Sequence, residues 1–532
     1  MFNKQIISFE DTNLFNKLVL DYLSKKKDTE QLYSFFPELD GYKKLLNTPK
    51  LFVNLNRSVL VDSLQAQANR VSNTSTHSAT NIKLLKNSNT FTVTTGHQLC
   101  LFTGPLYFIY KIIATINLSE WLSKNFPDKN FVPVYWMASE DHDFEEANHA
   151  FVYGKKIEWK SDQAGAVGSF KTTEIKEALN ELELFMGESS NGKELVQLFR
   201  NSYLEHTNLA DATRHLVNEL FGKYGLVIAD GNDKALKNEF KDLMKKDIFE
   251  NIPFQKVSTS IQYLQSKKYP TQVNPREINC FYLNGNARDR IEKQGEIYKV
   301  LNTSISFSKN ELEKLIDSEP EKISPNVVLR PLYQQIILPN IAYVGGPGEL
   351  SYWLEYKDMF DAFKCPFPIL QPRQFILVID KTQQQKLAKL GISVSAVFKS
   401  EQELVNQFIS NKGDIVDMQE EKNKLNKVFE DLLSKSIEVD KTLESAVKAE
   451  NQKALNSLNM LEAKLNKALK QRSDTELNQI KNIRSKLFPE NVPQERYDNF
   501  SAYYAKWGAG FIEEIKKQTE KNELAYLILL EN

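Results

Sequence analysis

The chain has 532 residues, which is enough for two or more domains, and 41% hydrophobic with 26% charged residues is ordinary for a globular protein. Its 68 basic and 69 acidic residues give a formal net charge of −1, without the basic excess of a nucleic-acid-binding protein. The N-terminus lacks the apolar region of a signal peptide, no stretch is apolar enough to span a membrane, and the three cysteines are isolated, so we expect a cytoplasmic protein without a disulfide framework or zinc knuckle.

The stretch before Phe91 is mainly helical in pattern, with turn signals at Pro37 and Pro49. An α/β alternation follows. Strands are predicted over 91–95 and 131–138, with an apolar helix over 105–124 between them and a short helix over 141–150. This order is typical of a βαβ unit. The more polar stretch over 155–215 is interpreted as an insertion that lies over the sheet edge.

Further strands are expected over 225–230, 281–283, 341–345 and 375–380. They alternate with helical patterns over 233–249 and 349–363. That alternation predicts an α/β fold with a mainly parallel sheet. The core is placed at residues 1–413.

The character of the sequence changes near residue 414, because no glycine occurs between Gly413 and Gly508. Apolar residues recur in three- and four-residue steps from Val447 to Ala468, which is the pattern of a coiled coil. An unbroken helix of about 55 residues would extend roughly 80 Å. Such an arm requires a partner, either its own return segment, the core or a second subunit. We expect a coiled coil over 414–488, a helix restarted by a capping box at Ser473 and Glu476, and a segment 489–532 that packs on the core.

The first candidate site is the loop after the first strand, Thr95-Gly96-His97-Gln98, continued by Gly104 and Pro105. Unsatisfied N–H groups at a helix N-terminus favour an anion. His97 and Gln98 can donate hydrogen bonds to phosphate, and Lys111 would add positive charge. The loop matches neither standard phosphate-binding fingerprint. A plain turn with glycine at positive φ is the alternative.

The second candidate is the acidic cluster that follows the second strand: Glu140, Asp141, His142, Asp143, Glu145, Glu146 and His149. A helix would place His142, Glu146 and His149 on one face, where they could bind a divalent metal or supply a general base. Crowded carboxylates also raise one another's pKa. The alternative is an acidic helix N-terminus, with Asp141 and Asp143 acting only as caps.

The third candidate is Gly345-Gly346-Pro347-Gly348-Glu349, at a strand-to-helix junction that permits close approach of a ligand to the backbone. Glu349 and Tyr352 would face the same pocket. Arg330 could bind a carboxylate or phosphate through both arms of its guanidinium. In the C-terminal segment, Arg496, Lys506 and Trp507 could flank an adenine and its phosphates, forming a second nucleotide site, or could merely seal a domain junction.

Four blocks carry a resemblance over nearly the whole chain: TGHQLCLFTGPLYFIYK, VPVYWMASEDHDFEEANH, YVGGPGELSYW and LFPENVPQERYDNF. In this order they resemble the cysteine-adding enzymes of bacillithiol biosynthesis. The resemblance implies a Rossmann-like parallel-sheet core related to class I aminoacyl-tRNA synthetases, with insertions and a C-terminal α-helical coiled coil that mediates dimerisation. His97 stands where the family often has Gln, and Cys100 where it usually has Gly.

The activity implied by the resemblance is ligation of L-cysteine to glucosaminyl-malate, with ATP as the expected activating cosubstrate and no metal assigned. On this hypothesis Asp141 or His142 accepts the ammonium proton of the sugar, and the loop at 95–98, Pro105 and Lys111 stabilise charge on phosphate. His97 completes the catalytic set. Glycines 345, 346 and 348 line the nucleotide or acyl pocket, and Arg330 binds a malate carboxylate.

Two other functions are compatible with the same features. One is a nucleotidyl- or glycosyl-transferase on this scaffold, which would not form an amide. The other is a coiled-coil assembly protein whose core only senses a nucleotide, which would bind a ligand without turnover.

Overall fold

The computed structural model describes residues 1–285, 287–411 and 416–532, without the side chains of 469–472. The chain divides into two compact units, Met1–Leu377 with Gln494–Ile528, and Val378–Pro493 with Leu529–Asn532. It leaves the first unit within β14 (Phe375–Ile379) and passes to the second again near the end of β15 (Tyr526–Glu531).

A five-stranded parallel sheet forms the centre of the first unit, in the order β13-β12-β2-β3-β6. Its strands are β13 (Ile369–Pro372), β12 (Asn340–Gly345), β2 (Thr90–His97), β3 (Asn130–Met137) and β6 (Val227–Asp230). Every residue of β2 is buried, as expected for a central strand covered on both faces. The predicted parallel α/β core is confirmed.

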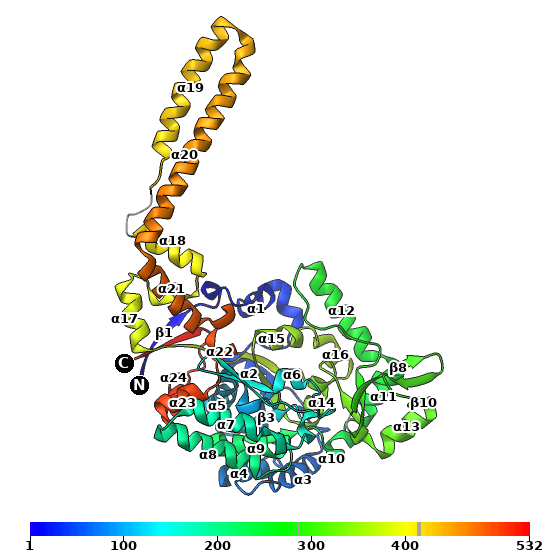
Figure 1. The fold of residues 1–532 in the computed structure, drawn as a ribbon. Helices are drawn as coiled ribbons and strands as arrows, with labels where there is room; N and C mark the ends of the chain where they lie inside the picture. The colour runs from blue at the N-terminus through cyan, green and yellow to red at the C-terminus, as the bar shows by residue number, and fades with distance from the viewer. Residues whose placement is uncertain (286, 412–415) are drawn as a thin grey trace. The chain divides into compact units, whose positions relative to one another are not determined.

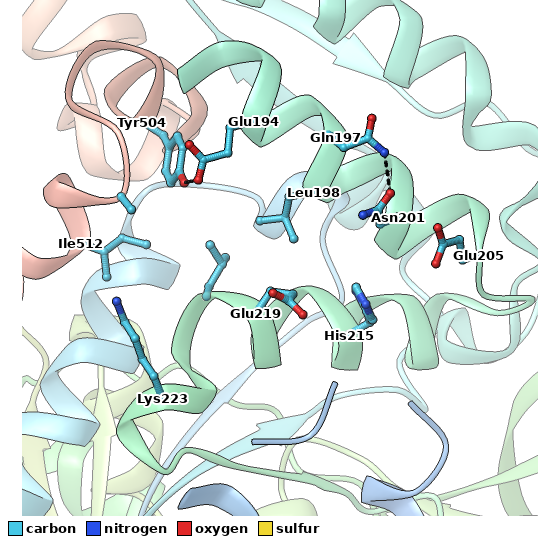
Figure 2. A pocket seen from close by; sticks show the side chains of 12 residues that line it. Glu194, Gln197, Leu198, Asn201, Glu205, His215, Glu219, Lys223, Tyr504 and Ile512 are labelled. Carbon is cyan, nitrogen blue, oxygen red and sulfur yellow. Dashed lines mark hydrogen bonds between the residues drawn. The ribbon is translucent and has the colours of Figure 1, made fainter. Parts of the chain in front are cut away.

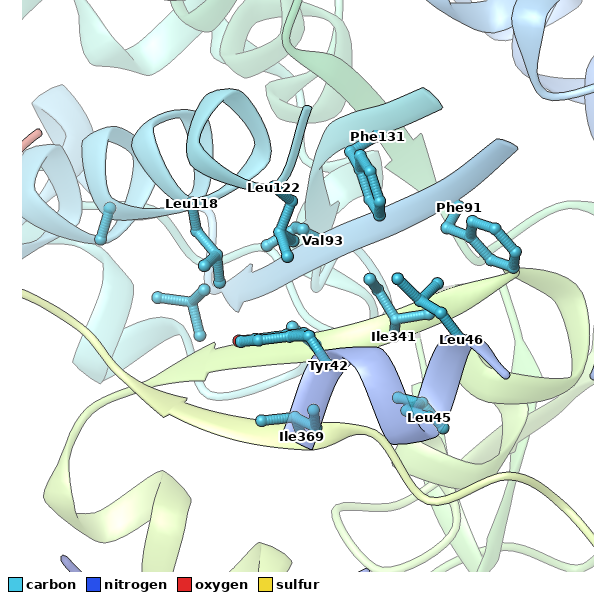
Figure 3. Packing of buried hydrophobic residues seen from close by; sticks show 13 residues of the cluster. Tyr42, Leu45, Leu46, Phe91, Val93, Leu118, Leu122, Phe131, Ile341 and Ile369 are labelled. Atoms are coloured by element: carbon cyan, nitrogen blue, oxygen red, sulfur yellow. The ribbon is translucent and has the colours of Figure 1, made fainter. Parts of the chain in front are cut away.

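Helix α5 (Tyr107–Asn125) joins β2 to β3 and completes the predicted βαβ unit. Figure 3 shows how its apolar face packs with the sheet and with α2 (Leu39–Leu46). The cluster consists of residues from α2, α5 and four strands: Tyr42, Leu45, Leu46, Phe91, Val93, Ala114, Leu118, Leu122, Phe131, Ile341, Ala342, Val344 and Ile369. This packing fixes the strand ends from which the site loops emerge.

An antiparallel sheet in the order β10-β9-β8-β7-β11 follows the parallel strands β2, β3 and β6 in the chain. Its strands are β7 (Cys280–Asn284), β8 (Ala287–Gln294), β9 (Ile297–Val300), β10 (Ser306–Ser308) and β11 (Ile323–Pro325). The strand expected over 281–283 is therefore present, but the prediction that it belongs to a parallel sheet was wrong. A short strand alone does not reveal its partner, because pairing direction depends on the connection. A hairpin of β4 (His149–Val152) and β5 (Lys155–Glu158) was also missed.

The helices of the first unit surround these sheets, and several predicted helices are shorter or broken. The pattern over 233–249 forms two helices that separate at Glu239, and that over 349–363 forms two that separate near Glu355. The further helices are α1 (Lys17–Leu23), α3 (Arg57–Ala68), α4 (Thr76–Leu84), α6 (Phe144–Ala147), α7 (Lys176–Met186), α8 (Ser190–Leu204), α9 (Leu209–Phe221), α10 (Lys234–Asn238), α11 (Lys241–Glu250), α12 (Ile252–Ser266), α13 (Lys309–Ser318), α14 (Arg330–Ile337), α15 (Pro347–Trp353), α16 (Lys357–Ala362), α22 (Gln494–Tyr497), α23 (Ser501–Trp507) and α24 (Gly510–Gln518); strand β1 (Phe2–Ile7) opens the chain.

The second unit contains a helical hairpin of α19 (Gln419–Val439) and α20 (Glu444–Arg472), which lie side by side in Figure 1. The arm does not form one unbroken helix, because the backbone becomes extended at Asp440 and turns back. The arm pairs with its own return segment, through contacts that include Asn451 with Asn426 and Lys422 with Glu462.

The remaining helices of this unit are α17 (Lys381–Lys389), α18 (Glu401–Asn411) and α21 (Asp474–Leu487). Ser473 is the N-cap of α21 as predicted, but its side chain does not form the capping hydrogen bond. Among the described residues, no helix combines the length and the apolarity needed to cross a membrane.

Candidate active site

The loops after β2 and β3 meet at one edge of the parallel sheet. The register pairs His97 with Met137, so the two strands end at the same level. Beyond these ends, the Gln98 Nε2 atom donates hydrogen bonds of 2.8 Å to Asp141 and 2.8 Å to Glu146. Because parallel strands bind ligands at their carboxyl ends, this junction is the candidate active site.

A cavity of about 740 Å³ opens at this edge of the sheet. Its walls include thirteen residues predicted from the sequence: Gly96, His97, Gln98, Lys111, Glu140, Asp141, His142, Arg330, Gly346, Gly348, Glu349, Tyr352 and Arg496. A Cβ atom added at Gly348 would meet nothing within 4 Å, so the backbone there faces open space. The size and the mixed lining suit a small polar substrate.

His97 lies at the cavity wall in a largely buried position. Burial, followed by the positive charges of Lys111 and Arg373, holds the pKa of His97 well below its ordinary value of 6.5. The ring is therefore neutral near neutral pH and cannot contribute a positive charge to phosphate binding. Its Nε2 atom is buried on the side of Gly104 and has no hydrogen-bond partner among the described residues.

Lys111 reaches the same wall from α5 but is already engaged. Its ammonium donates to the carbonyl of Gly96 and forms an ion pair with Glu349 at 2.8 Å. Burial alone would raise the pKa of Glu349, but the Lys111 charge and hydrogen bonds from Gly346 N–H and Tyr343 O–H leave it below its usual range. Lys111 thus ties β2, α5 and the glycine-rich turn together, with its charge already neutralised.

Asp141 organises the acidic loop. Its Oδ1 accepts the backbone N–H groups of His142 at 2.8 Å and Asp143 at 3.3 Å, while Oδ2 accepts Gln98. A carboxylate offers about four lone-pair positions, so Oδ2 retains one acceptor position.

In His142, the Nδ1 atom accepts a hydrogen bond of 3.0 Å from Arg288. Burial and the Arg288 charge lower the pKa of His142. Asp141 is therefore the better placed of the two to accept a proton.

The predicted helical face of His142, Glu146 and His149 was wrong. Helix α6 contains only Phe144–Ala147, and His149 begins β4. Asp143 accepts the N–H of Glu146 at 3.2 Å and ends the preceding loop as an N-cap. Within the described ranges, no group of three or more His, Cys, Asp or Glu side chains is arranged to hold a metal ion. Because the helix has only four residues, His142 and His149 lie outside it, and the i, i+4, i+7 spacing does not place them on one helical face.

Eight residues of the predicted sites do not line this cavity: Thr95, Gly104, Asp143, Glu145, His149, Gly345, Lys506 and Trp507. The Thr95 hydroxyl donates to the Val344 carbonyl at 2.8 Å and joins two strands. Gly104 has φ of +70°, and a Cβ there would lie 2.6 Å from that of Cys100. Thr95 and Gly104 therefore stabilise the local backbone structure and do not contact the cavity. Cys100 itself is buried, which raises its pKa to about 12 and leaves the thiol protonated.

Arginines that the sequence pattern did not reveal also line the cavity: Arg276, Arg288, Arg290 and Arg373. Arg373 forms a bidentate ion pair with Glu495, with 2.9 and 2.8 Å contacts, and both side chains are almost fully buried. Through this pair the C-terminal segment after Pro493 supports the cavity wall. No motif marks these arginines, because they come from three separate segments.

A second cavity, of about 490 Å³, lies between α8, α9 and the C-terminal helices of the first unit (Figure 2). Glu194, Glu219 and His215 are among its lining residues, and Tyr504 donates to Glu194 at 2.8 Å. Lys506 and Trp507 do not line it. The ammonium of Lys506 lies 4.5 Å from the Trp507 ring centroid, whereas Arg496 lines the main cavity.

The strap of residues 270–279 lines part of the main cavity and is anchored by buried carboxylates. Glu355 accepts the N–H groups of Gln272 at 2.6 Å and Val273 at 3.3 Å. Asp247 accepts the backbone N–H of Asn279 at 2.6 Å and its side-chain amide at 2.9 Å. Burial raises the pKa of Glu355 and of Asp247 to about 7.

Glu355 should make the stability of the first unit depend on pH. Its pKa is higher in the folded chain, at about 7, than the ordinary 4.5. Its contribution is therefore fully present below pH 4.5 and is lost as the pH rises through 7. At about 1.4 kcal/mol for each pH unit between the two pKa values, the loss is at most about 3 kcal/mol. Urea unfolding at pH 5 to 8 should show a steeper decline for the wild type than for Glu355→Gln; parallel curves would contradict this assignment.

Comparisons with known proteins match both parts of the chain. Residues 2–374 match the family model described as "Bacillithiol biosynthesis BshC, N-terminal Rossmann-like domain", and residues 376–531 match "Bacillithiol biosynthesis BshC, C-terminal coiled-coil domain". A protein of Flavobacterium psychrophilum is 45% identical, covering 96% of each chain, and one of Flavobacterium johnsoniae is 42% identical, covering 98% of this chain and 99% of its own. Both carry the name "Putative cysteine ligase BshC".

A solved structure from Campylobacter jejuni, titled "putative arginyl t-RNA synthetase", is 12% identical, and the match covers 85% of this chain and 98% of that one. Its TM-score of 0.22 is too low to support an argument.

Proposed function

The chain belongs to the bacillithiol-biosynthesis BshC family, and from this membership we propose that it is a cysteine ligase that joins L-cysteine to glucosaminyl-malate in the last step of bacillithiol synthesis. The family name supports formation of a carbon–nitrogen bond. It does not support a nucleotidyl- or glycosyl-transferase or a non-catalytic sensor. A biosynthetic role of this kind is expected in the cytoplasm.

The observation that carries the proposal is the pair of hydrogen bonds from Gln98 to Asp141 and Glu146 above the ends of two parallel strands. One bound molecule can contact both loops there. On this proposal the ammonium group of the sugar lies near Asp141, whose Oδ2 accepts its proton so that a neutral amine attacks the cysteine carboxyl carbon. His142, held by Arg288, orients the loop, and the neutral His97 ring forms part of the cavity wall.

ATP is the activating cosubstrate that we propose, and it would supply a good leaving group on the cysteine carboxylate. The cavity fits its negative charge through Arg496, which forms no ion pair with any carboxylate of the described residues. The backbone of Gly346 and Gly348 leaves space for the nucleotide or acyl group. Lys111, neutralised by Glu349, holds this wall in place. Arg330 is also close enough to the substrate space to bind a malate carboxylate.

Incubation of the pure protein with cysteine, glucosaminyl-malate and ATP tests the proposal. Mass spectrometry should detect bacillithiol, with AMP rather than ADP as the nucleotide product. A parallel reaction without ATP should yield no amide. Amide formed in the reaction without ATP would exclude ATP as the activating cosubstrate. If neither reaction forms the amide and the substrates are converted to other products, the ligase activity is excluded.

We also propose that the protein forms a homodimer through the α19–α20 hairpin. Apolar side chains remain uncovered on both helices, with Val428 54%, Leu432 46%, Leu461 46% and Leu465 39% exposed. They recur at intervals of four residues, so each helix presents them on one face. A second copy would remove this surface from water.

The double variant Leu461→Glu/Leu465→Glu should convert the dimer to a monomer, because charges would be buried at the interface. Sedimentation velocity at micromolar concentration measures the change. Lys464→Glu, on an exposed polar position of the same helix, should leave the dimer intact. A double variant that still sediments as a dimer would exclude the hairpin as the interface.

A further inference from the structure

The main cavity contains more positive than negative charge once its internal ion pairs are taken into account. Glu140 is paired with Lys237, and Glu349 with Lys111. Of the lining arginines, only Arg373 has a carboxylate partner in the described part of the chain. The others, Arg276, Arg288, Arg290, Arg330 and Arg496, form no such ion pair. Arg276, Arg290 and Arg496 are exposed, whereas Arg288 and Arg330 are partly buried. These five guanidiniums outnumber the lining carboxylates that have no Lys or Arg partner in the described part of the chain, Asp141 and Glu146. The cavity therefore suits an anion with several charges.

Arg288 is the most firmly held of these arginines. Its Nε donates to Ser324 Oγ at 3.0 Å, one terminal nitrogen donates to the Pro325 carbonyl at 3.0 Å, and the other donates to His142. All three acceptors are uncharged if His142 is neutral. Burial lowers the pKa of Arg288 and outweighs the attraction of the Glu140 and Asp141 carboxylates, neither of which forms an ion pair with it. The hydrogen bonds orient its fork but do not neutralise it.

Arg290 lies two residues further along β8, on the same face as Arg288. The two guanidiniums lie 4.2 Å and 5.8 Å from the ring centroid of Phe281 on β7. Phe281 thus supports both. Arg276 lies on the adjoining strap, where its backbone is held by Asn279 through contacts of 3.2 and 2.8 Å. Asn279 is in turn held by Asp247. Together Arg276, Arg288 and Arg290 form what we call the arginine wall.

We propose that the arginine wall determines specificity for the acidic aglycone, with Arg288 and Arg290 binding one carboxylate of the malyl group while Arg330 binds the other. This inference rests on the proposed function. The malyl group carries two free carboxylates separated by two carbons, which one guanidinium cannot bind together. Pro325, which accepts from Arg288, lies on the same short segment as Arg330, so the two guanidiniums approach the cavity from neighbouring positions.

On this proposal the enzyme recognises its substrate mainly through the malyl aglycone rather than through the sugar. Hydrogen bonds to a charged group contribute about 1.5 to 3 kcal/mol each, so loss of the malyl carboxylates should weaken binding strongly. The arginine wall would also place the sugar amine near Asp141, because His142 connects Arg288 to the acidic loop.

The test compares Arg288→Gln, Arg288→Lys and Arg290→Gln with the wild type in steady-state kinetics. The KM for glucosaminyl-malate should rise about tenfold to a hundredfold in the two glutamine variants, as follows from loss of one charged hydrogen bond. The KM values for cysteine and ATP should stay within about twofold. Arg288→Lys should recover only part of the loss, because lysine retains the charge without the fork. Lys293→Gln, an exposed position of β8 outside the cavity, removes the same charge and should match the wild type.

A binding measurement separates this proposal from the ligase activity. Saturation-transfer NMR with free L-malate and free L-lactate requires no turnover, and L-malate should give the stronger signal, reduced in Arg290→Gln. A rise in KM for ATP instead would assign the arginine wall to phosphate and overturn the proposal. Unchanged values for all substrates in folded Arg290→Gln and Arg288→Gln would also overturn it. Failure of the wild type to form any amide, with L-malate binding intact, would refute the ligase alone.

Discussion

The variant Glu349→Gln is expected to lose about 3 to 5 kcal/mol of the free energy of unfolding, because it leaves a buried ammonium without its counterion. The Lys111 side chain is 3% exposed, whereas that of Glu349 is 22% exposed and faces the cavity. Lys111→Met should therefore cost less, since the remaining carboxylate keeps the hydrogen bonds of Gly346 and Tyr343 and partial access to solvent. Urea unfolding of the purified proteins at pH 7 measures both.

The double variant Lys111→Met/Glu349→Gln should recover most of the stability lost by Glu349→Gln, because it removes both buried charges. The deficit of Glu349→Gln should also shrink as the pH rises, since a neutral Lys111 amine tolerates burial. Lys44→Met, which breaks an exposed ion pair with Asp40, serves as the control and should change stability little. Equal losses in both single variants, or no recovery in the double variant, would contradict this account of the pair.

Asp141→Asn is expected to lower kcat by about 10² to 10⁴-fold, the range by which general bases accelerate reactions. Asparagine keeps the size of the side chain and one acceptor oxygen for the N–H groups of His142 and Asp143. It loses the oxygen that accepts from Gln98, but Gln98 keeps its hydrogen bond to Glu146, so the loop should remain folded. His142→Gln should reduce kcat much less and mainly raise the KM for glucosaminyl-malate, because His142 already accepts a hydrogen bond from Arg288.

Rapid-quench measurement of amide formation distinguishes these effects from slow product release. Glu145→Gln removes one negative charge from the same loop at an exposed position and should turn over like the wild type. Near-normal turnover by Asp141→Asn would exclude Asp141 as the proton acceptor. A larger loss of kcat in His142→Gln than in Asp141→Asn would transfer that role to the imidazole.

The sequence alone located the two loops of the site, because its signals are local. A β-branched strand, a glycine-bearing turn and an apolar helix leading to a second strand predict a βαβ unit. Parallel strands necessarily bring both loops to one edge of the sheet. That reasoning correctly brought Gln98 and Asp141 together. Local signals also predicted the helical C-terminal arm, where glycine and proline are absent over long stretches.

The tertiary structure alone decided which charges in the cavity are free. Lys111 is a plausible phosphate ligand in the sequence, but Glu349 reaches it from 238 residues away and neutralises it. Arg288 appears in a polar strand without any motif, yet the antiparallel sheet carries it to His142 from 146 residues away. The spacing of apolar residues also did not reveal which partner the arm has, because the chain reverses at a break in the helix at Asp440. Sequence patterns record the repeat of neighbouring residues, whereas counterions and turns of this kind depend on contacts between distant segments.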